Sequence, residues 1–462
     1  MNSFFDIYQS PFSWRYGSVK MRELFSEVNK RKTWRKVWVS LAKAQAKQGL
    51  VSKAELADII KNQKRIDIKK AQDLEVDLKH DLMAEVRVFA SQAKIGGGKI
   101  HFGATSQDIE DNADILIFQE ALKMVEVNLK ELIKTWAKRI EENKNLICMA
   151  YTHLQPAEPT TLGYRFSFYA QDLLHDLEFV QFIKKQLKGK GLKGAVGNSA
   201  SYVSIAGTKA QQLEDDFLKD LKIKAFDITS QVYPRKLDYL LLTCLSAIAQ
   251  SLYKFAFDLR ILQSGPFGEL AEPFGKKQIG SSAMPFKRNP QTSEKICALA
   301  RYIAGQTKIS WDYAANSLLE RTLDDSAGRR MIFPDSFLAV DEILTQTNIV
   351  VNGLVINKKN IEKNLNTFGP FSALESILLK STKNGANRQK IHEILREHAL
   401  NAYDNIQKTG NNNLFETVAN DKIITKFLTK IEIDSLSNYK SHIGMAVKKS
   451  QDTTQKIKVI AK

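Results

Sequence analysis

Apolar residues recur at helical spacing through the middle of the chain. Between Asp114 and Asn143 they fall three or four positions apart, at Ile115, Phe118, Leu122, Val125, Leu129, Leu132, Trp136 and Ile140. That spacing traces one face of a long amphipathic helix. Further long helices are expected over 291–315, beginning just after Pro290, and over about 334–354.

The segment from Leu237 to Leu262 differs from these because it is apolar on nearly every side. A helix without a polar face is buried among other helices. Several helices this long, joined by proline-bearing loops, indicate a helical bundle, and the all-round apolar helix favours a homo-oligomer whose bundles pack together. Clear strand alternation is scarce. The sequence therefore predicts an all-α protein with a central bundle of long helices.

Three domains are expected along the chain. Residues 1–111 carry shorter helical patterns, 112–356 the long bundle, and 357–462 a smaller basic helical domain. The candidate linkers are the glycines at 96–98 and the polar stretch 357–360.

Composition narrows the class of protein. The chain has 462 residues, of which 43% are hydrophobic, enough for a large core and too many for a mainly disordered protein. Its longest uncharged apolar-rich stretch, Tyr239 to Tyr253, is shorter than the roughly 20 residues that span a bilayer. The N-terminus lacks the features of a signal peptide. Three dispersed cysteines without a CxxC pair favour neither a zinc ribbon nor a disulfide framework. We expect a reduced, soluble, cytoplasmic protein with no membrane partner.

The charge is strongly positive. There are 68 Lys and Arg against 51 Asp and Glu, a net charge of +17, and residues 357–462 alone carry a net +8. Such a balance indicates either an anionic partner or a solvated lysine-rich surface. No basic stripe interleaved with aromatic residues and no nucleic-acid motif accompanies it. Nucleic acid is therefore not the expected partner.

The most informative motif is GSSAMPFKRNP, residues 280–290, which is followed by Glu294. Backbone N–H groups at a helix start favour an anion, and Lys287 adds a positive charge. Ser281 is a candidate nucleophile or base, although a serine hydroxyl needs activation for either role. We interpret the segment as a mobile anion-binding loop rather than a plain surface turn.

Two further motifs carry polar groups that suit catalysis or binding. In YTHLQPAEPTT, residues 151–161, two prolines fix the backbone just after His153, so that its imidazole, which titrates near neutral pH, has a rigid mount. A lone histidine is nonetheless more often structural than catalytic. In HFGATSQD, residues 101–108, Thr105 and Ser106 either bind a carboxylate or cap the next helix. From these residues alone the cap is the better interpretation.

In this order, the three motifs closely resemble the three sequence blocks of the fumarase/aspartase superfamily of lyases. Within it, the chain resembles the adenylosuccinate lyase family from about Arg15 to at least Arg330. The narrower resemblance rests on Arg15-Tyr16, Lys79-His80-Asp81, Gln231 and the run RTLDDSAGRR, residues 321–330. Planar guanidinium groups in that run suit a phosphate.

The resemblance implies a tetramer of all-α subunits whose active sites each draw on three subunits. It implies β-elimination of fumarate from adenylosuccinate, giving AMP, and also from the succinylated imidazole ribotide of purine synthesis. It implies no metal and no organic cofactor. A lyase or cycloisomerase acting on another carboxylate is the alternative, and it would need no phosphate site.

The resemblance also assigns roles. Ser281 is implied as the base, His153 as the general acid oriented by Glu294, and His80 as a second candidate for the acid. Loop amides and Lys287 are implied to stabilise the developing aci-carboxylate. The residues implied to bind substrate are Arg15, Tyr16, Lys79, Asp81, His101, Thr105, Ser106, Thr152, Gln231, Ser282, Lys287, Asn289, Arg321, Ser326 and Arg330. The other histidines, His175, His392, His398 and His442, are expected to be structural or on the surface.

Two positions depart from the family pattern. Asp324-Asp325 stand where many members carry Ser-His, which places unexpected carboxylates beside the implied phosphate site. Phe286 stands where a polar ring is common. Neither change affects the residues of the elimination itself.

Overall fold

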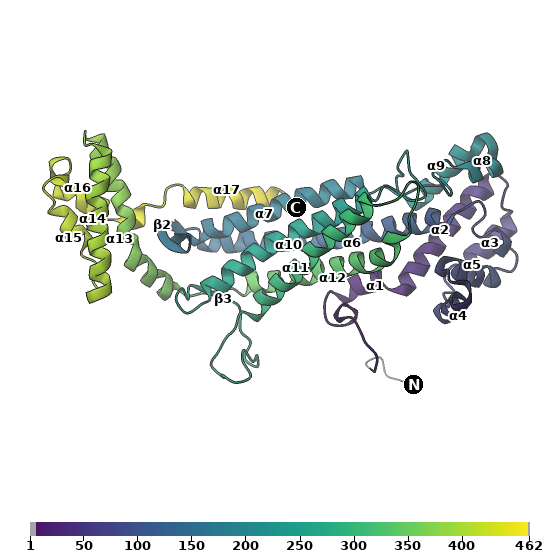
Figure 1. Ribbon diagram of the computed structural model, residues 1–462, viewed down its shortest axis with the longest axis horizontal. Helices are drawn as coiled ribbons and strands as arrows, with labels where there is room; N and C mark the ends of the chain where they lie inside the picture. Colours follow the sequence, from purple (N-terminus) through teal and green to yellow (C-terminus); the bar gives the residue numbers. More distant parts are fainter. Residues whose placement is uncertain (1–5, 461–462) are drawn as a thin grey trace. The chain divides into compact units, whose positions relative to one another are not determined.

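The structure contains five long bundle helices, four of which the apolar spacing predicts; the fifth, Leu162–Gln186, was not predicted. The computed structural model describes residues 6–460, and these helices are α6 (Ser106–Asn143), α7 (Leu162–Gln186), α10 (Lys236–Leu262), α11 (Gln291–Ala315) and α12 (Asp324–Asn352) (Figure 1). The expected all-α class is confirmed. The bounds of α11 match the prediction, and α10 begins one residue earlier than expected.

The other two long helices begin earlier than expected. Helix α6 starts at Ser106 rather than Asp114, because its first turns carry polar residues that face buried partners. Helix α12 starts at Asp324, about ten residues before its expected start at about residue 334. Pro334 lies inside α12, although an interior proline removes one backbone hydrogen bond.

The chain folds into two compact units, each made from three separate stretches. The first unit comprises Met1–Leu129, His175–Leu252 and Cys297–Thr345, and the second comprises Lys130–Leu174, Tyr253–Ile296 and Gln346–Lys462. Each long helix therefore contributes residues to both units. The expected division into three domains stays a prediction.

Shorter helices complete the first unit. They are η1 (Pro11–Ser13), α1 (Val19–Leu24), α2 (Glu27–Lys47), α3 (Lys53–Asn62), α4 (Ile68–Leu78), α5 (Asp81–Gln92), η2 (Gly97–Lys99), α8 (Ala200–Ala206), η3 (Gly207–Lys209) and α9 (Ala210–Leu221). Helix α4 packs on α5, and α2 packs on α3 and α9. Between α2 and α5, the buried carboxylate of Glu85 accepts hydrogen bonds from Arg35 Nε at 2.6 Å and Arg31 Nη1 at 3.0 Å.

The second unit contains two small antiparallel sheets and the C-terminal helices. Strand β1 (Ile147–Thr152) pairs with β2 (Gln155–Thr161), and β3 (Leu270–Ala271) pairs with β4 (Val355–Ile356). The helices are α13 (Lys358–Lys383), α14 (Arg388–Thr409), α15 (Leu414–Ala419), η4 (Ile424–Lys426), α16 (Lys430–Leu436), η5 (Tyr439–Ser441) and α17 (Ala446–Ile460).

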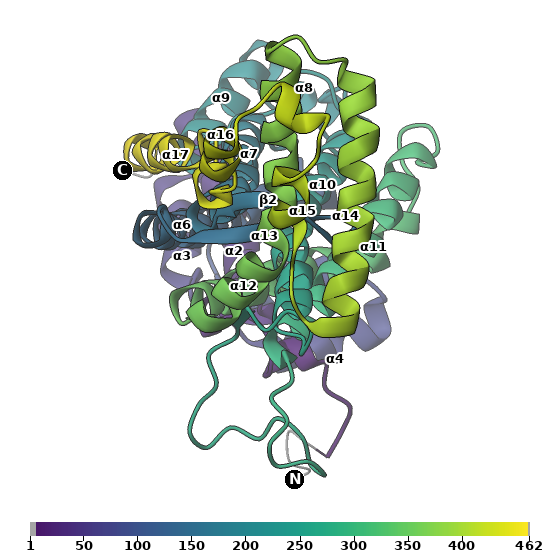
Figure 2. The ribbon, with the colours of Figure 1, turned by 90° about the vertical axis from the view of Figure 1, so that its left-hand side faces the viewer.

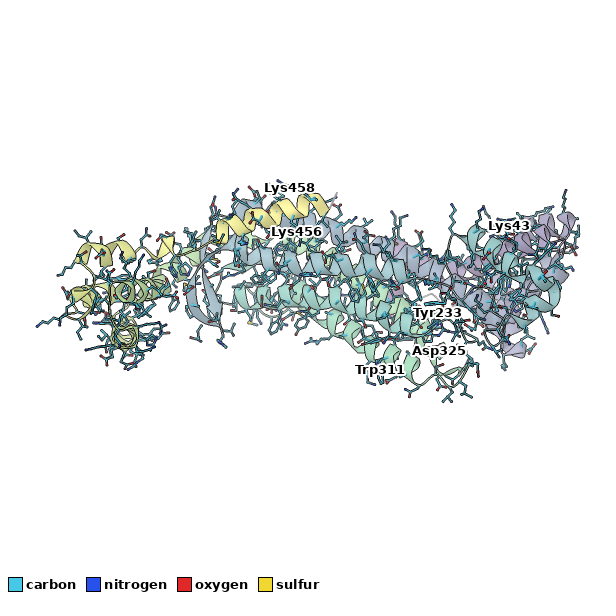
Figure 3. The ribbon with its side chains drawn as sticks, turned by 90° about the horizontal axis from the view of Figure 1, so that it is seen from above. Lys43, Tyr233, Trp311, Asp325, Lys456 and Lys458 are labelled. Carbon is cyan, nitrogen blue, oxygen red and sulfur yellow. The ribbon has the colours of Figure 1, made fainter. Side chains whose placement is uncertain are left out.

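An apolar core holds the C-terminal helices together. Helices α13 and α14 run side by side, and α15 and α16 pack against them (Figures 1 and 2). Ile377, Ile391, Leu414 and Ile433 meet in this core. Lys456 and Lys458, two of the basic residues of the C-terminal part, are exposed on α17 (Figure 3).

Helix α10 is the one described helix that is long and apolar enough to cross a membrane by length and composition. Core helices of soluble proteins can be equally long and apolar. About half (56%) of its most apolar 18-residue stretch is buried inside the protein. Its first turn carries Asp238, whose carboxylate forms an ion pair with Arg329. These features identify it as a core helix.

Candidate active site

A cavity of about 140 Å³ in the first unit gathers three of the residues implied to bind phosphate. Arg321 precedes α12, while Ser326 and Arg330 lie on its first two turns. The lining also includes apolar rings, among them Trp34 and Phe118. Cationic and hydroxyl groups together with aromatic rings suit a ligand with a phosphate and a planar base.

The Lys79-His80-Asp81 segment reaches the same region through Asp81. Asp81 Oδ2 lies 2.8 Å from Arg330 Nη1. Burial by itself raises the pKa of the Asp81 carboxyl, but the Arg330 guanidinium outweighs burial and holds the pKa below its ordinary value. Lys79 ends α4 in the left-handed conformation, with φ +52°, which turns the chain into this segment.

His80 lies beside the start of α6. Its Nε2 is 3.3 Å from the hydroxyl of Ser106. The backbone N–H of Thr105 donates to the carboxylate of Asp108 at 3.0 Å, which is half of a capping box. The capping interpretation is therefore wrong for Ser106, because its hydroxyl faces the imidazole. The structure brings a predicted acid and a predicted binding residue together.

An extended ion-pair network includes several residues of the cavity lining. Asp325 accepts from Arg321 Nη1 at 2.8 Å and from Arg235 Nε at 2.7 Å, and Arg235 Nη1 reaches Asp111 on α6 at 3.0 Å. The Arg235 guanidinium also lies 4.6 Å from the ring centre of Tyr233, which Figure 3 labels together with Asp325. Buried charges of this kind persist because each is paired.

Arg329 is fully engaged in the same network. It donates to Asp238 at 2.8 Å and to the Tyr233 hydroxyl at 2.6 Å, and its Nη1 lies 3.0 Å from Asp114 Oδ2. Its role is to hold α12 against α6 and α10. All three arginines of the run line the cavity, but Arg321 and Arg330 each have one carboxylate ion-pair partner, whereas Arg329 has two.

Glu110 on α6 adds an unusual carboxyl to the cavity wall. It accepts a hydrogen bond from Gln107 Nε2 at 2.6 Å. Burial and the neighbouring carboxylates of Asp81 and Asp114 raise the pKa of Glu110 to about 8, against the opposing effect of Arg330. Glu110 therefore carries a proton at neutral pH.

The GSSAMPFKRNP segment forms a long loop between β3 and α11 in the second unit (Figures 1 and 2). The Ser281 hydroxyl accepts from the backbone N–H of Met284 at 3.1 Å, and Asn289 Nδ2 donates to the carbonyl of Gly280 at 2.9 Å. A side chain at position 280 would meet the Lys287 carbonyl at 2.1 Å, so glycine is needed for this close approach. Ser282 and Lys287 are exposed.

The start of α11 holds an internal anion. The backbone N–H groups of Thr292 and Ser293 donate to the buried carboxylate of Glu272 at 3.1 and 2.5 Å. The expectation that this helix start binds an external anion is therefore wrong, because Glu272 occupies its free amides. Glu294, one residue further on, is exposed.

His153 lies on the tip of the hairpin formed by β1 and β2. Thr152 pairs with Gln155, so His153 and Leu154 form a two-residue turn with φ of +53° and +59°. Such a turn normally takes asparagine and glycine, and strained residues of this kind are found at functional sites. The hairpin was not predicted, because Pro156 and Pro159 disguise β2.

A buried ion pair supports the hairpin from below. Arg165 Nη1 lies 3.2 Å from Glu269 Oε2, and the Tyr151 hydroxyl donates to Glu269 Oε1 at 2.8 Å. Burial, followed by the Glu269 carboxylate, raises the pKa of Tyr151, which therefore stays protonated. Thr152 and His153 are exposed above this support.

The remaining predicted residues lie on separate segments. Arg15 stacks over the Tyr16 ring at 5.9 Å, and Gln231 donates from its backbone to Glu320, next to Arg321. His101 Nδ1 accepts from Trp38 Nε1 at 3.1 Å. Burial, opposed by Asp108, lowers the pKa of His101.

Three of the histidines expected to be structural have defined surroundings. His398 contacts Thr417 and Asp421, and His442 contacts Ser376 and Glu375. His175 is exposed, 3.8 Å from Glu178.

The structure thus gathers Arg321, Ser326 and Arg330 with Asp81, and Ser106 with His80. Among the described residues, no hydrogen bond or ion pair joins the hairpin tip to the GSSAMPFKRNP loop. Sequence reasoning missed Arg235, Asp111, Glu110 and Glu272. Only the position of Arg235 in the run TSQVYPRK, close to Gln231, gave any signal.

Comparison with known families extends these observations over the chain. Residues 16–305 match the family model described as lyase, and residues 370–451 match the one described as adenylosuccinate lyase C-terminus. An adenylosuccinate lyase of Schistosoma mansoni is 39% identical and covers 90% of this chain and 88% of its own. Those of Saccharomyces cerevisiae and Archaeoglobus fulgidus are 35% and 34% identical, covering 98% and 94% of this chain and 95% and 96% of their own.

Solved structures share the fold at lower identity. A fumarate lyase from Mesorhizobium sp. BNC1 superposes with a TM-score of 0.85 at 22% identity, over 97% of this chain and 99% of its own. The 3-carboxy-cis,cis-muconate lactonizing enzyme from Pseudomonas putida superposes with a TM-score of 0.85 at 21% identity, over 98% and 99%.

Proposed function

Because the chain belongs to the adenylosuccinate lyase family, we propose that it releases fumarate from adenylosuccinate by β-elimination and leaves AMP. The observation that carries this proposal is similarity to adenylosuccinate lyases over nearly the whole chain, including the C-terminal region that has its own family model. The cavity that gathers Arg321, Ser326 and Arg330 supports it, since a lyase of non-nucleotide substrates needs no phosphate site. The succinylated imidazole ribotide is proposed as a second substrate.

The phosphate end of the substrate lies at Arg321, Ser326 and Arg330 in this proposal. Two guanidinium groups bind phosphate oxygens in pairs, and the serine hydroxyl donates a third hydrogen bond. Arg15 and Tyr16, from another segment, also bind the phosphate end of the substrate. The rings of Trp34 and Phe118 in the cavity lining then contact the base.

The elimination itself is assigned to the loop and the hairpin. The oxygen of Ser281 takes the β-proton of the succinyl group, and loop amides at Ser282 with Lys287 stabilise the resulting aci-carboxylate. The carbon–nitrogen bond breaks as the double bond of fumarate forms. His153, oriented by Glu294, delivers the proton that the departing nitrogen needs.

Several residues hold the carboxylates in this scheme. Thr105, Ser106 and Thr152 lie on one side and Asn289 on the other. The strained turn at His153 supports its role, because it holds this residue at the exposed tip of the hairpin.

The site is completed by oligomerisation in this proposal. We propose that each active site draws the hairpin tip, the loop and the start of α6 from three subunits of a homotetramer, which is supported by the absence, among the described residues, of a hydrogen bond or ion pair between the hairpin tip and the loop. We also place the enzyme in the cytoplasm. Sedimentation at several protein concentrations tests the tetramer.

The activity is tested by mixing purified protein with adenylosuccinate and following fumarate and AMP. Turnover of this substrate is the expected result. Absence of turnover, together with turnover of another amino- or carboxy-succinate, would favour the alternative lyase or cycloisomerase.

The role of Ser281 has its own test. The substitution S281A is expected to lower kcat by about 10²–10⁴ while the tetramer persists in sedimentation. A near-normal rate would remove Ser281 from the role of base.

The choice between the two candidate acids follows from pH profiles. H153Q is expected to remove the limb of the kcat profile that reports the acid, whereas H80Q keeps that limb and raises KM. The reverse result would assign the acid to His80.

A further inference from the structure

We propose that Asp325 is a positioning residue that fixes Arg321 for phosphate binding and anchors it to α6 through Arg235. The proposal rests on the proposed function, because it concerns the subsite assigned to the 5′-phosphate. It also gives a purpose to one of the two carboxylates that depart from the family pattern.

Both oxygens of Asp325 are already occupied. Oδ1 accepts from Arg321 Nη1 at 2.8 Å, and Oδ2 accepts from Arg235 Nε at 2.7 Å. The side chain is only 4% exposed, so that a substrate cannot reach it. Asp325 therefore acts on the ligand only through its arginine partners.

The carboxylate remains charged in this position. Burial alone raises the pKa of Asp325, but Arg235, Arg329 and Arg321 together outweigh burial and hold the pKa below its ordinary value. An ionised carboxylate makes stronger hydrogen bonds to guanidinium groups than a neutral acid does. Arg321 is thus held by a permanent partner.

Arg235 carries the restraint to a second element. Its Nη1 lies 3.0 Å from Asp111 Oδ1, and Asp111 Oδ2 accepts the backbone N–H of Tyr233 at 2.8 Å. Asp111 is fully buried on α6. The chain of contacts therefore ties the segment that bears Arg321 to the body of a long helix.

Fixing an arginine in advance favours binding. A free arginine side chain loses rotamer entropy when a ligand orders it, and a side chain already held in place avoids that cost. Arg321 is 14% exposed and uses Nη1 on Asp325, which leaves its other N–H edge for a phosphate. Loss of Asp325 frees Arg321 and leaves Arg235 with one carboxylate fewer.

An electrostatic role and a positioning role of Asp325 predict opposite effects of its removal on phosphate binding. If only charge mattered, removing a carboxylate beside a phosphate site would strengthen phosphate binding, because one repulsion disappears. If Asp325 positions Arg321, its removal weakens binding. The chain offers a matched control in Asp324, which precedes Asp325 in the first turn of α12 and is exposed.

The test compares D325N with D324N in the full-length enzyme. The readouts are the Kd of AMP by calorimetry, and KM and kcat for adenylosuccinate and for the same compound without its 5′-phosphate. D325N is expected to raise the AMP Kd and the adenylosuccinate KM about tenfold or more, and to leave the KM of the dephosphorylated compound and both kcat values near wild type. D324N is expected to leave the AMP Kd unchanged or slightly lower.

AMP binding as tight in D325N as in wild type, or tighter, would overturn the proposal. So would equal losses for the phosphorylated and dephosphorylated substrates, which indicate general damage. The double variant R321A/D325N is expected to bind AMP no more weakly than R321A alone, and a further tenfold loss would contradict action through Arg321.

A second variant, D325E, and AMP binding by the wild-type enzyme make the test independent of folding and of turnover. If D325N does not fold, D325E retains the charge but reaches one methylene further, and it is expected to shift the AMP Kd in the same direction by less; an unchanged Kd counts against the proposal. AMP binding also separates this proposal from the proposed function. A wild-type enzyme that binds AMP without turning over adenylosuccinate contradicts the function and leaves the test of Asp325 intact.

Discussion

Replacing Glu110 by glutamine tests whether the cavity holds a protonated carboxyl. The ordinary pKa of glutamate is 4.5, and the pKa of Glu110 in the folded protein is about 8. Between these values the folded protein holds a proton that the unfolded chain has released. The free energy of unfolding of wild type therefore falls as pH rises from 4.5 to 8, owing to this group.

The size of the effect follows from the two pKa values. Each tenfold difference in proton affinity is worth 1.36 kcal/mol, which gives about 3 kcal/mol at pH 7 and at most about 5 kcal/mol above pH 8. E110Q is neutral at every pH and keeps an acceptor for Gln107. Its stability advantage over wild type is thus expected to be near zero at pH 4.5 and to grow through neutral pH.

Urea unfolding at pH 5, 7 and 9, at one protein concentration and ionic strength, measures this difference. E120Q is the matched control, because Glu120 lies on the same helix with a side chain that is 63% exposed. Its unfolding curves are expected to follow wild type at all three pH values. Equal pH slopes for E110Q and wild type would refute the reasoning. Above pH 8, ionised Glu110 also competes with phosphate for Arg330, so the KM for adenylosuccinate is expected to rise there in wild type and to rise less in E110Q.

Three further predictions follow from other parts of the structure. E85A leaves the buried guanidinium groups of Arg31 and Arg35 without their shared partner and is expected to cost about 3–5 kcal/mol in urea unfolding; a loss below 1 kcal/mol would contradict the burial of this group. L154G relieves a left-handed residue that is 59% exposed and is expected to stabilise the protein by about 0.5–1 kcal/mol, seen as a higher Tm; a lower Tm would show that the side chain matters more than the strain. R330K keeps a charge but loses paired contacts, so the KM for adenylosuccinate is expected to rise about tenfold with little change for the dephosphorylated compound; equal changes would place Arg330 outside the phosphate subsite.

Local signals predicted much of the fold and long-range pairing explains the misses. Pro290 marked the start of α11 correctly, because the helix begins at the next residue. The start of α12 was misplaced at about residue 334, because the first turns of this helix carry ion pairs with distant residues. The β1–β2 hairpin was missed because prolines hide its strand pattern and histidine and leucine occupy a turn that favours other residues.

In the candidate site too, local motifs predicted some residues, whereas their long-range partners were missed. Arg321, Ser326 and Arg330 were expected together, and they line one cavity. Their partners were not predictable, because Arg235 meets Asp325 ninety positions away and Asp111 more than a hundred positions away. The anion at the start of α11 was also missed, because Glu272 lies twenty positions before the amides that it binds. Pairings at this separation depend on tertiary packing, which no local pattern encodes.

The construction of each unit from three stretches of chain has a consequence for biosynthesis. The first unit includes residues up to Thr345, so its last stretch leaves the ribosome only after about three quarters of the chain has been made. At roughly 5–20 residues per second this takes about 20–70 seconds. During that time the apolar face of α6 lacks its α12 partner, since the Phe118 ring packs 4.6 Å from the ring of Phe333. The nascent chain is therefore exposed to aggregation for most of its synthesis, and nascent chains released before residue 345 are expected to engage chaperones rather than fold.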